Sequence, residues 1–158
     1  MRKIVGWVLV AGFAASSLVA CSSTPAASTS PLVGRWGSSE ANPPSLITSS
    51  STEWTFNADK TATRIDTVVY KDVPLAMNPD AQCTSVNQFA GMAWSTSGTD
   101  AISITGGTST GTVTCPDAGR NRMSPAQPAN LTLTGTYAVT GTTLALTLNG
   151  SAATMTRK

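Results

Sequence analysis

The sequence predicts an all-β fold, an antiparallel up-and-down meander, and two observations carry this prediction. Apolar residues alternate with threonine in short runs, as where Leu131, Leu133 and Tyr137 share one face of the segment 131–139. Such alternation is typical of strands with one buried and one solvated face. Turn-forming pairs separate the runs, and Asn149-Gly150 is a strong hairpin signal because both central residues of a type I′ turn need positive φ.

The N-terminal half of the chain predicts a hairpin with strands at about 52–57 and 61–70. Trp54 and Phe56 alternate with polar neighbours in the first strand, and residues 58–60 supply the turn. The C-terminus predicts a meander of three strands, and these strands cover about 131–139, 142–148 and 151–157.

The middle of the chain predicts one short helix near 79–90. Asn78 suits the N-cap, Pro79 suits the first helical position, and Gly91 would end the helix. A further hairpin follows, with strands at about 92–96 and 101–105 and another strand near 110–115. Two segments rich in Ser, Pro, Asn and Ala, 37–51 and 116–130, are interpreted as long loops.

Gly34-Arg35-Trp36 lies where the first strand is expected, and Arg157 lies on the last one. Together with a long first loop and a run of antiparallel strands, this pattern resembles a small bacterial lipocalin-like barrel. The resemblance implies about eight strands, with Trp36 closing one end of the barrel and Arg157 packing over its ring. Strand parity agrees, because Met155 and Arg157 share a face, so an inward Met155 allows a cation–π contact.

The N-terminus has the parts of an export signal in order. Arg2 and Lys3 precede an uncharged run from Ile4 to Ala20, and Cys21 follows. The tetrapeptide 18–21, Leu-Val-Ala-Cys, resembles the lipobox of bacterial lipoproteins. This resemblance implies transfer of diacylglycerol to the Cys21 thiol and cleavage before it. Ordinary signal peptidase cleavage after Ala20 and an uncleaved membrane span are the alternatives.

The chain is then expected to divide into a signal peptide (1–20), a flexible Ser/Thr/Pro tether (21–31) and a single β-barrel domain (32–158). Ser22 rather than Asp follows Cys21, which among lipoproteins implies the outer membrane facing the periplasm, or the outer face of the cell membrane in a host without an outer membrane.

Net charge argues against a nucleic-acid partner. The chain carries 10 Lys and Arg against 8 Asp and Glu, and Arg2 and Lys3 would leave with the signal peptide. The remaining positive and negative side chains are equal in number, so we expect no affinity for nucleic acid.

Cys83 and Cys115 remain after Cys21 is assigned to lipid. A pair of cysteines in an exported protein favours a disulfide. A metal pair or a redox couple are the alternatives, but the chain has no histidine and the two cysteines lack Cys-x-x-Cys spacing.

The sequence leaves two hypotheses for function. In the first, aromatic side chains line a cavity for an apolar small molecule, and the candidates are Trp54, Phe56, Trp94 and Tyr137. In the second, these side chains fill the barrel, and the loops 37–51 and 116–130 contact another envelope protein or the cell wall, or inhibit a hydrolase. Arg64 and Asp66 alternate on one strand face that we interpret as solvated.

We expect no enzyme activity, cofactor or metal site. The absence of histidine excludes Ser-His and Cys-His catalysis and most catalytic zinc sites. The eight carboxylates are scattered, mostly in or beside predicted turns, where Asp bonds locally to the backbone. The expected partners are the membrane, through lipid on Cys21, and an apolar small molecule or an envelope protein.

Mass spectrometry of the protein isolated from membranes tests the lipobox prediction. We expect an N-terminus at Cys21 that carries the mass of diacylglycerol, because stable anchoring needs two or more acyl chains. A free Cys21 thiol, or a chain that still begins at Met1, would contradict the prediction.

Overall fold

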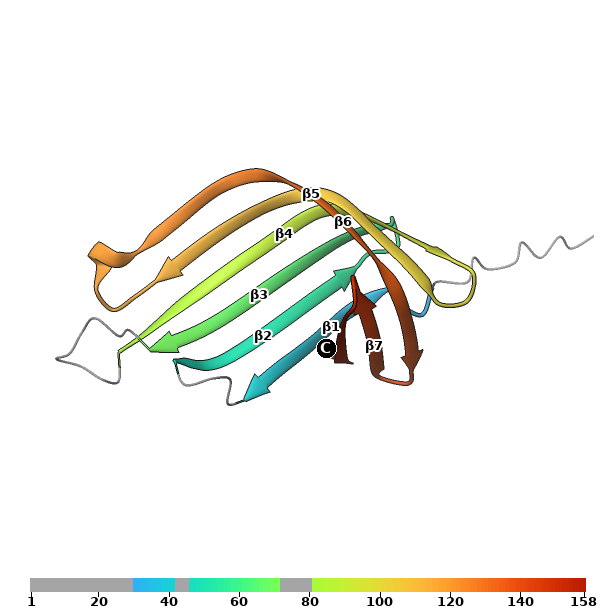
Figure 1. The fold of residues 1–158 in the computed structure, drawn as a ribbon, viewed down its shortest axis with the longest axis horizontal. Coiled ribbons are helices and arrows are strands. Elements are labelled where there is room, and N and C mark those ends of the chain that lie inside the picture. The colour runs from blue at the N-terminus through green and yellow to red at the C-terminus, as the bar shows by residue number, and fades with distance from the viewer. Residues whose placement is uncertain (1–29, 42–45, 72–80) are drawn as a thin grey trace, which may run out of the picture.

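Eight strands run antiparallel to their neighbours in chain order and close into a barrel (Figure 1), so the predicted all-β meander is confirmed. The strands are β1 (Gly34–Ala41), β2 (Ile47–Phe56), β3 (Thr61–Lys71), β4 (Gln82–Ser97), β5 (Ala101–Thr114), β6 (Arg122–Thr140), β7 (Thr143–Leu148) and β8 (Ser151–Arg157).

The computed structural model describes residues 30–41, 46–71 and 81–158. The predicted signal peptide, Cys21 and nearly all of the predicted tether lie outside these ranges, as do Asn78 and Pro79. Within the described ranges, no helix is long and apolar enough to cross a membrane.

Local turn chemistry sets the hairpins that the sequence predicts. Asn149 and Gly150 join β7 to β8 with φ of 47° and 84°, as a type I′ turn requires. Between β2 and β3, a carboxylate oxygen of Asp59 accepts hydrogen bonds from the hydroxyl and the backbone N–H of Thr61, at 2.6 and 2.9 Å. These two bonds, the hydroxyl bond first, lower the pKa of Asp59.

The predicted helix near 79–90 is wrong in its described part, because β4 begins at Gln82. Pairing decides the conformation: β4 lies between β3 and β5, and both neighbours bind its backbone. Gly91, expected to end a helix, has φ of 65° where the β3–β4 register shifts between Ala62 and Arg64. It is therefore part of a β-bulge that bends the strand.

The two predicted loops, 37–51 and 116–130, are also largely strand. Residues 37–41 continue β1, 47–51 begin β2, and β6 begins at Arg122. Pro125 and Pro128 are tolerated in β6 because β7 pairs with this strand only from Gly135 onward. Among the described residues, the N-terminal part of β6 is thus an edge on that side, and its pairing with β5 is irregular around both prolines, where the register shifts; edges and bulges are the places where strands accommodate proline. The strand expected near 110–115 is the continuation of β5.

The strands differ greatly in length, and this difference shapes the molecule. β4, β5 and β6 contain 16, 14 and 19 residues, whereas β7 and β8 contain 6 and 7. The long strands therefore run past the short ones as a curved sheet (Figure 1). β1 and β8 meet along a seam of two residue pairs, Trp36 with Arg157 and Gly37 with Thr156.

Side chains fill the closed part of the barrel. Trp54 stacks on Phe56 with ring centroids 5.4 Å apart, and Trp94 meets Phe56 edge-on at 5.7 Å. The Trp94 indole N–H donates to the carbonyl oxygens of Asn57 and Thr61, so its buried polar atom is satisfied. The buried core cluster comprises Leu32, Trp36, Trp54, Phe56, Ala62, Met92, Trp94, Ile102, Ile104, Leu144, Leu146 and Met155.

The predicted disulfide between Cys83 and Cys115 is confirmed. It joins β4 to the residue that follows β5, at the start of β4 and far along these strands from the core residue Trp94. The backbone N–H of Cys115 donates to the Asn121 side chain at 2.8 Å. The bridge therefore fastens the far end of the curved sheet, where fewer buried side chains hold the strands together.

Removing this disulfide is expected to lower the free energy of unfolding by about 3–4 kcal/mol. The bridge closes a loop between two residues 32 positions apart, and without it the unfolded chain gains conformational entropy. Urea unfolding followed by tryptophan fluorescence, with and without reductant, measures the change. The double variant Cys83→Ala/Cys115→Ala is the control and should not respond to reductant. Equal midpoints for the oxidised and reduced chains would contradict the prediction.

Candidate functional site

The structure brings Trp36 and Arg157 together at the seam. The Trp36 ring is fully buried, its indole N–H donates to the carbonyl of Leu32 at 2.8 Å, and the guanidinium carbon of Arg157 lies 4.3 Å from the ring centroid. The terminal nitrogens of Arg157 donate to the carbonyls of Val33 and Pro31 at 3.1 and 2.9 Å. One side chain thus ties the last strand to the segment before β1.

Gly34 makes this approach feasible. Its φ is 139°, and a Cβ at this position would lie 2.7 Å from a terminal nitrogen of Arg157. The glycine two residues before Trp36 therefore has a steric role, because any larger residue would push the guanidinium away from the ring.

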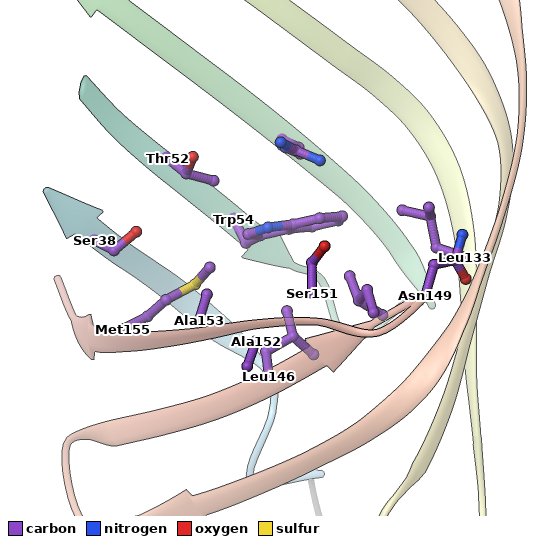
Figure 2. A pocket seen from close by; sticks show the side chains of 12 residues that line it. Ser38, Thr52, Trp54, Leu133, Leu146, Asn149, Ser151, Ala152, Ala153 and Met155 are labelled. Atoms are coloured by element: carbon purple, nitrogen blue, oxygen red, sulfur yellow. The ribbon is translucent and has the colours of Figure 1, made fainter. Parts of the chain in front are cut away.

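A pocket of about 310 Å³ lies where the short β7–β8 hairpin faces β1, β2 and β3 (Figure 2). We call it the mouth pocket. Trp54 stacks on Phe56 in the core and also lines the mouth pocket, so it separates the filled interior from the open space. The lining residues are Ser38, Thr52, Trp54, Arg64, Leu133, Leu146, Leu148, Asn149, Ser151, Ala152, Ala153 and Met155.

An ion pair stands at the edge of the mouth pocket. The Nε atom of Arg64 lies 2.9 and 2.8 Å from the two carboxylate oxygens of Asp66, and the Thr52 hydroxyl donates to Asp66 at 2.8 Å. The Arg64 guanidinium carbon is 5.6 Å from the Trp54 ring centroid and 5.8 Å from that of Phe89. Arg64 and Asp66 therefore lie on the same face as the buried Trp54, the inner face of the barrel, although both side chains stay partly exposed.

Hairpin register is the signal that could have located this pair. The turn at 57–60 places Phe56 opposite Ala62, and hence Trp54 opposite Arg64 and Thr52 opposite Asp66. Residues that face each other across antiparallel strands share one side of the sheet. An inward Trp54 thus predicts an inward Arg64.

Some of the other polar side chains of the mouth pocket already form hydrogen bonds within the protein. The Asn149 side chain accepts from the Thr134 N–H at 3.0 Å and donates to the Thr132 carbonyl at 3.3 Å. The Thr52 hydroxyl donates to Asp66. Among the described residues, the Ser38 and Ser151 hydroxyls and the two terminal nitrogens of Arg64 have no hydrogen-bond partner.

Of the four aromatic residues predicted to line a cavity, one lies at the mouth pocket and three lie in or against the core. Trp54 lines the mouth pocket, whereas Phe56 and Trp94 belong to the filled core and Tyr137 packs against that core, half-buried. Aliphatic residues of the C-terminal meander supply the rest of the apolar wall. In the described part of the chain, no group of three Cys, Asp or Glu residues could hold a metal ion.

Comparisons with known proteins found no match: no family model, no curated protein and no solved structure matches this chain.

Replacing Arg157 by alanine is expected to lower the free energy of unfolding by about 1–2 kcal/mol, because two charge-assisted hydrogen bonds and one cation–π contact are lost. Arg157→Lys is the matched control: it keeps the charge but cannot bond both carbonyls at once, so we expect an intermediate loss. Urea unfolding measures both variants. If Arg157→Ala is as stable as the parent, the contact does not hold the seam.

Proposed function

We propose that this chain is a lipid-anchored lipoprotein of the bacterial cell envelope whose lipocalin-like barrel binds a small, largely apolar molecule in the mouth pocket. The observation that carries this proposal is the preformed pocket between the filled core and solvent, with Trp54 as its base. Its volume of about 310 Å³ lies at the lower end of the range of small-molecule sites.

The construction of the mouth pocket supports binding. Leu146 and Met155 are buried, Trp54 is 2% exposed, and all three lie on paired strands rather than on loops. Rigid walls lose little entropy when a ligand binds. A mostly apolar surface with a few polar groups at its edge is the usual composition of such a site.

The N-terminal sequence supports the proposed location. The Leu-Val-Ala-Cys tetrapeptide at 18–21 would place two or more acyl chains on Cys21, and residues 21–31 would separate the barrel from the bilayer as a tether. Ser22 after the cysteine favours the outer membrane, with the barrel facing the periplasm.

The alternative function is contact with another envelope protein or inhibition of one. It relies on long loops at 37–51 and 116–130, but most of these residues lie in strands. The filled core remains compatible with it, but a filled core beneath an open pocket is equally compatible with ligand binding.

Filling the mouth pocket tests the proposal. Ala153→Phe places a ring among the lining residues, and we expect it to abolish saturable binding of 2-naphthamide, a flat neutral probe that can lie over Trp54. Ala145→Phe is the matched control, because Ala145 is exposed on the outer face of β7. Calorimetry on the full chain in lipid nanodiscs measures binding. Equal binding by the two variants would overturn the proposal, as would a parent chain that binds no flat aromatic probe of this size, neutral or anionic.

A further inference from the structure

We infer that the ligand of the mouth pocket is an amphipathic organic anion whose single negatively charged head binds the guanidinium of Arg64. This inference rests on the proposed function, because it names the chemical class of the molecule that the mouth pocket takes. Three features of the pocket lead to it: the orientation of one ion pair, the use of the other polar groups, and the number of charges in the lining.

The first feature is the orientation of the Arg64–Asp66 pair. Arg64 lines the mouth pocket, whereas Asp66 lies outside its lining and accepts a hydrogen bond from the hydroxyl of Thr52, a lining residue. Exposure agrees, since the Asp66 side chain is 19% exposed and that of Arg64 is 35% exposed. The pair is neutral overall, but its positive end faces the open space, so the local field favours an anion there.

The second feature is that Asp66 binds Arg64 only through Nε. Within the described residues, both terminal nitrogens of Arg64 are without a partner. A guanidinium presents its remaining N–H groups in a planar fork that matches the two oxygens of a carboxylate or sulfonate. Trp54 on β2 and Phe89 on β4 flank the side chain, which limits its movement and so pre-organises the fork.

The third feature is that few other charged or polar side chains of the mouth pocket are free to bind a ligand. Arg64 is the one charged residue that lines the mouth pocket among the described residues. Asn149 and Thr52 already hydrogen-bond within the protein, which leaves the two serine hydroxyls as neutral donors. One cation with no second positive group favours a ligand with one negative charge over a diphosphate or a dicarboxylate. The apolar wall requires that the rest of the ligand be hydrophobic.

A matched pair of probes tests this inference: 2-naphthoate, which carries a carboxylate, and 2-naphthamide, which has the same ring system and no charge. Calorimetry on the full chain in lipid nanodiscs should show on the order of tenfold tighter binding of 2-naphthoate. Arg64→Met should abolish this preference and leave 2-naphthamide binding within about twofold, because methionine keeps the apolar wall. Bound 2-naphthamide also shows that the variant is folded.

Two further variants sharpen the result. Arg35→Met removes the cation of the Arg35–Glu53 pair on the outer face of the barrel, so it should leave the preference for 2-naphthoate unchanged. Arg64→Lys keeps the charge without the fork and should retain part of the preference, which covers the case in which Arg64→Met fails to fold.

The outcomes separate the two proposals. If the parent chain binds neither probe, the proposed function fails. If the parent chain binds both probes equally, or if Arg64→Met keeps the preference, the mouth pocket binds small molecules but Arg64 does not select an anion, and this inference is overturned. If Arg35→Met loses the preference as Arg64→Met does, the effect comes from net charge rather than from the site, which also overturns it.

Discussion

Closure of the barrel depends on a seam of two residue pairs between the first and last strands. So short a ladder leaves most of β1 and β8 without each other as partners, and side chains supply what the backbone does not. Arg157 lies over the Trp36 ring and binds the carbonyls of Pro31 and Val33, while the Thr156 hydroxyl donates to the Gly37 carbonyl at 3.3 Å. These contacts add to the backbone pairs that keep the first and last strands from being open sheet edges.

The shortness of β7 and β8 has two consequences. It leaves the mouth pocket open, because β7 and β8 contain only 6 and 7 residues and no other described strand covers Trp54 beyond them. It also leaves the part of β6 before Thr132 without a neighbouring strand on one side among the described residues, since β7 pairs only from Gly135 and Asn149 binds Thr132 and Thr134. Pro125 and Pro128 lie in that free part, and a residue without an N–H cannot continue a ladder with another chain. The edge is therefore protected against strand addition by its own sequence.

Two ion pairs in this barrel have the same chemistry in different surroundings. Arg35 and Glu53 pair on the outer face, where the arginine side chain is 60% exposed and water screens the interaction. Arg64 and Asp66 pair on the inner face, beside two aromatic rings and the mouth pocket. Water screens the charges less there, so the attraction between Arg64 and Asp66 is stronger than that between Arg35 and Glu53.

The sequence by itself determined the class of fold, the hairpin at 52–70, the C-terminal meander and the Cys83–Cys115 pair, because turn residues and a period of two act locally. It also pointed to Trp36 and Arg157, which the structure places in contact. Only the tertiary structure decided that residues 82–90 and 122–130 are strands, since their backbone groups are satisfied by neighbours distant in sequence. The same holds for the mouth pocket. Alternation shows which residues share a face of a strand, but packing decides which face is inside, and hence that Arg64 lines a pocket rather than the outer surface.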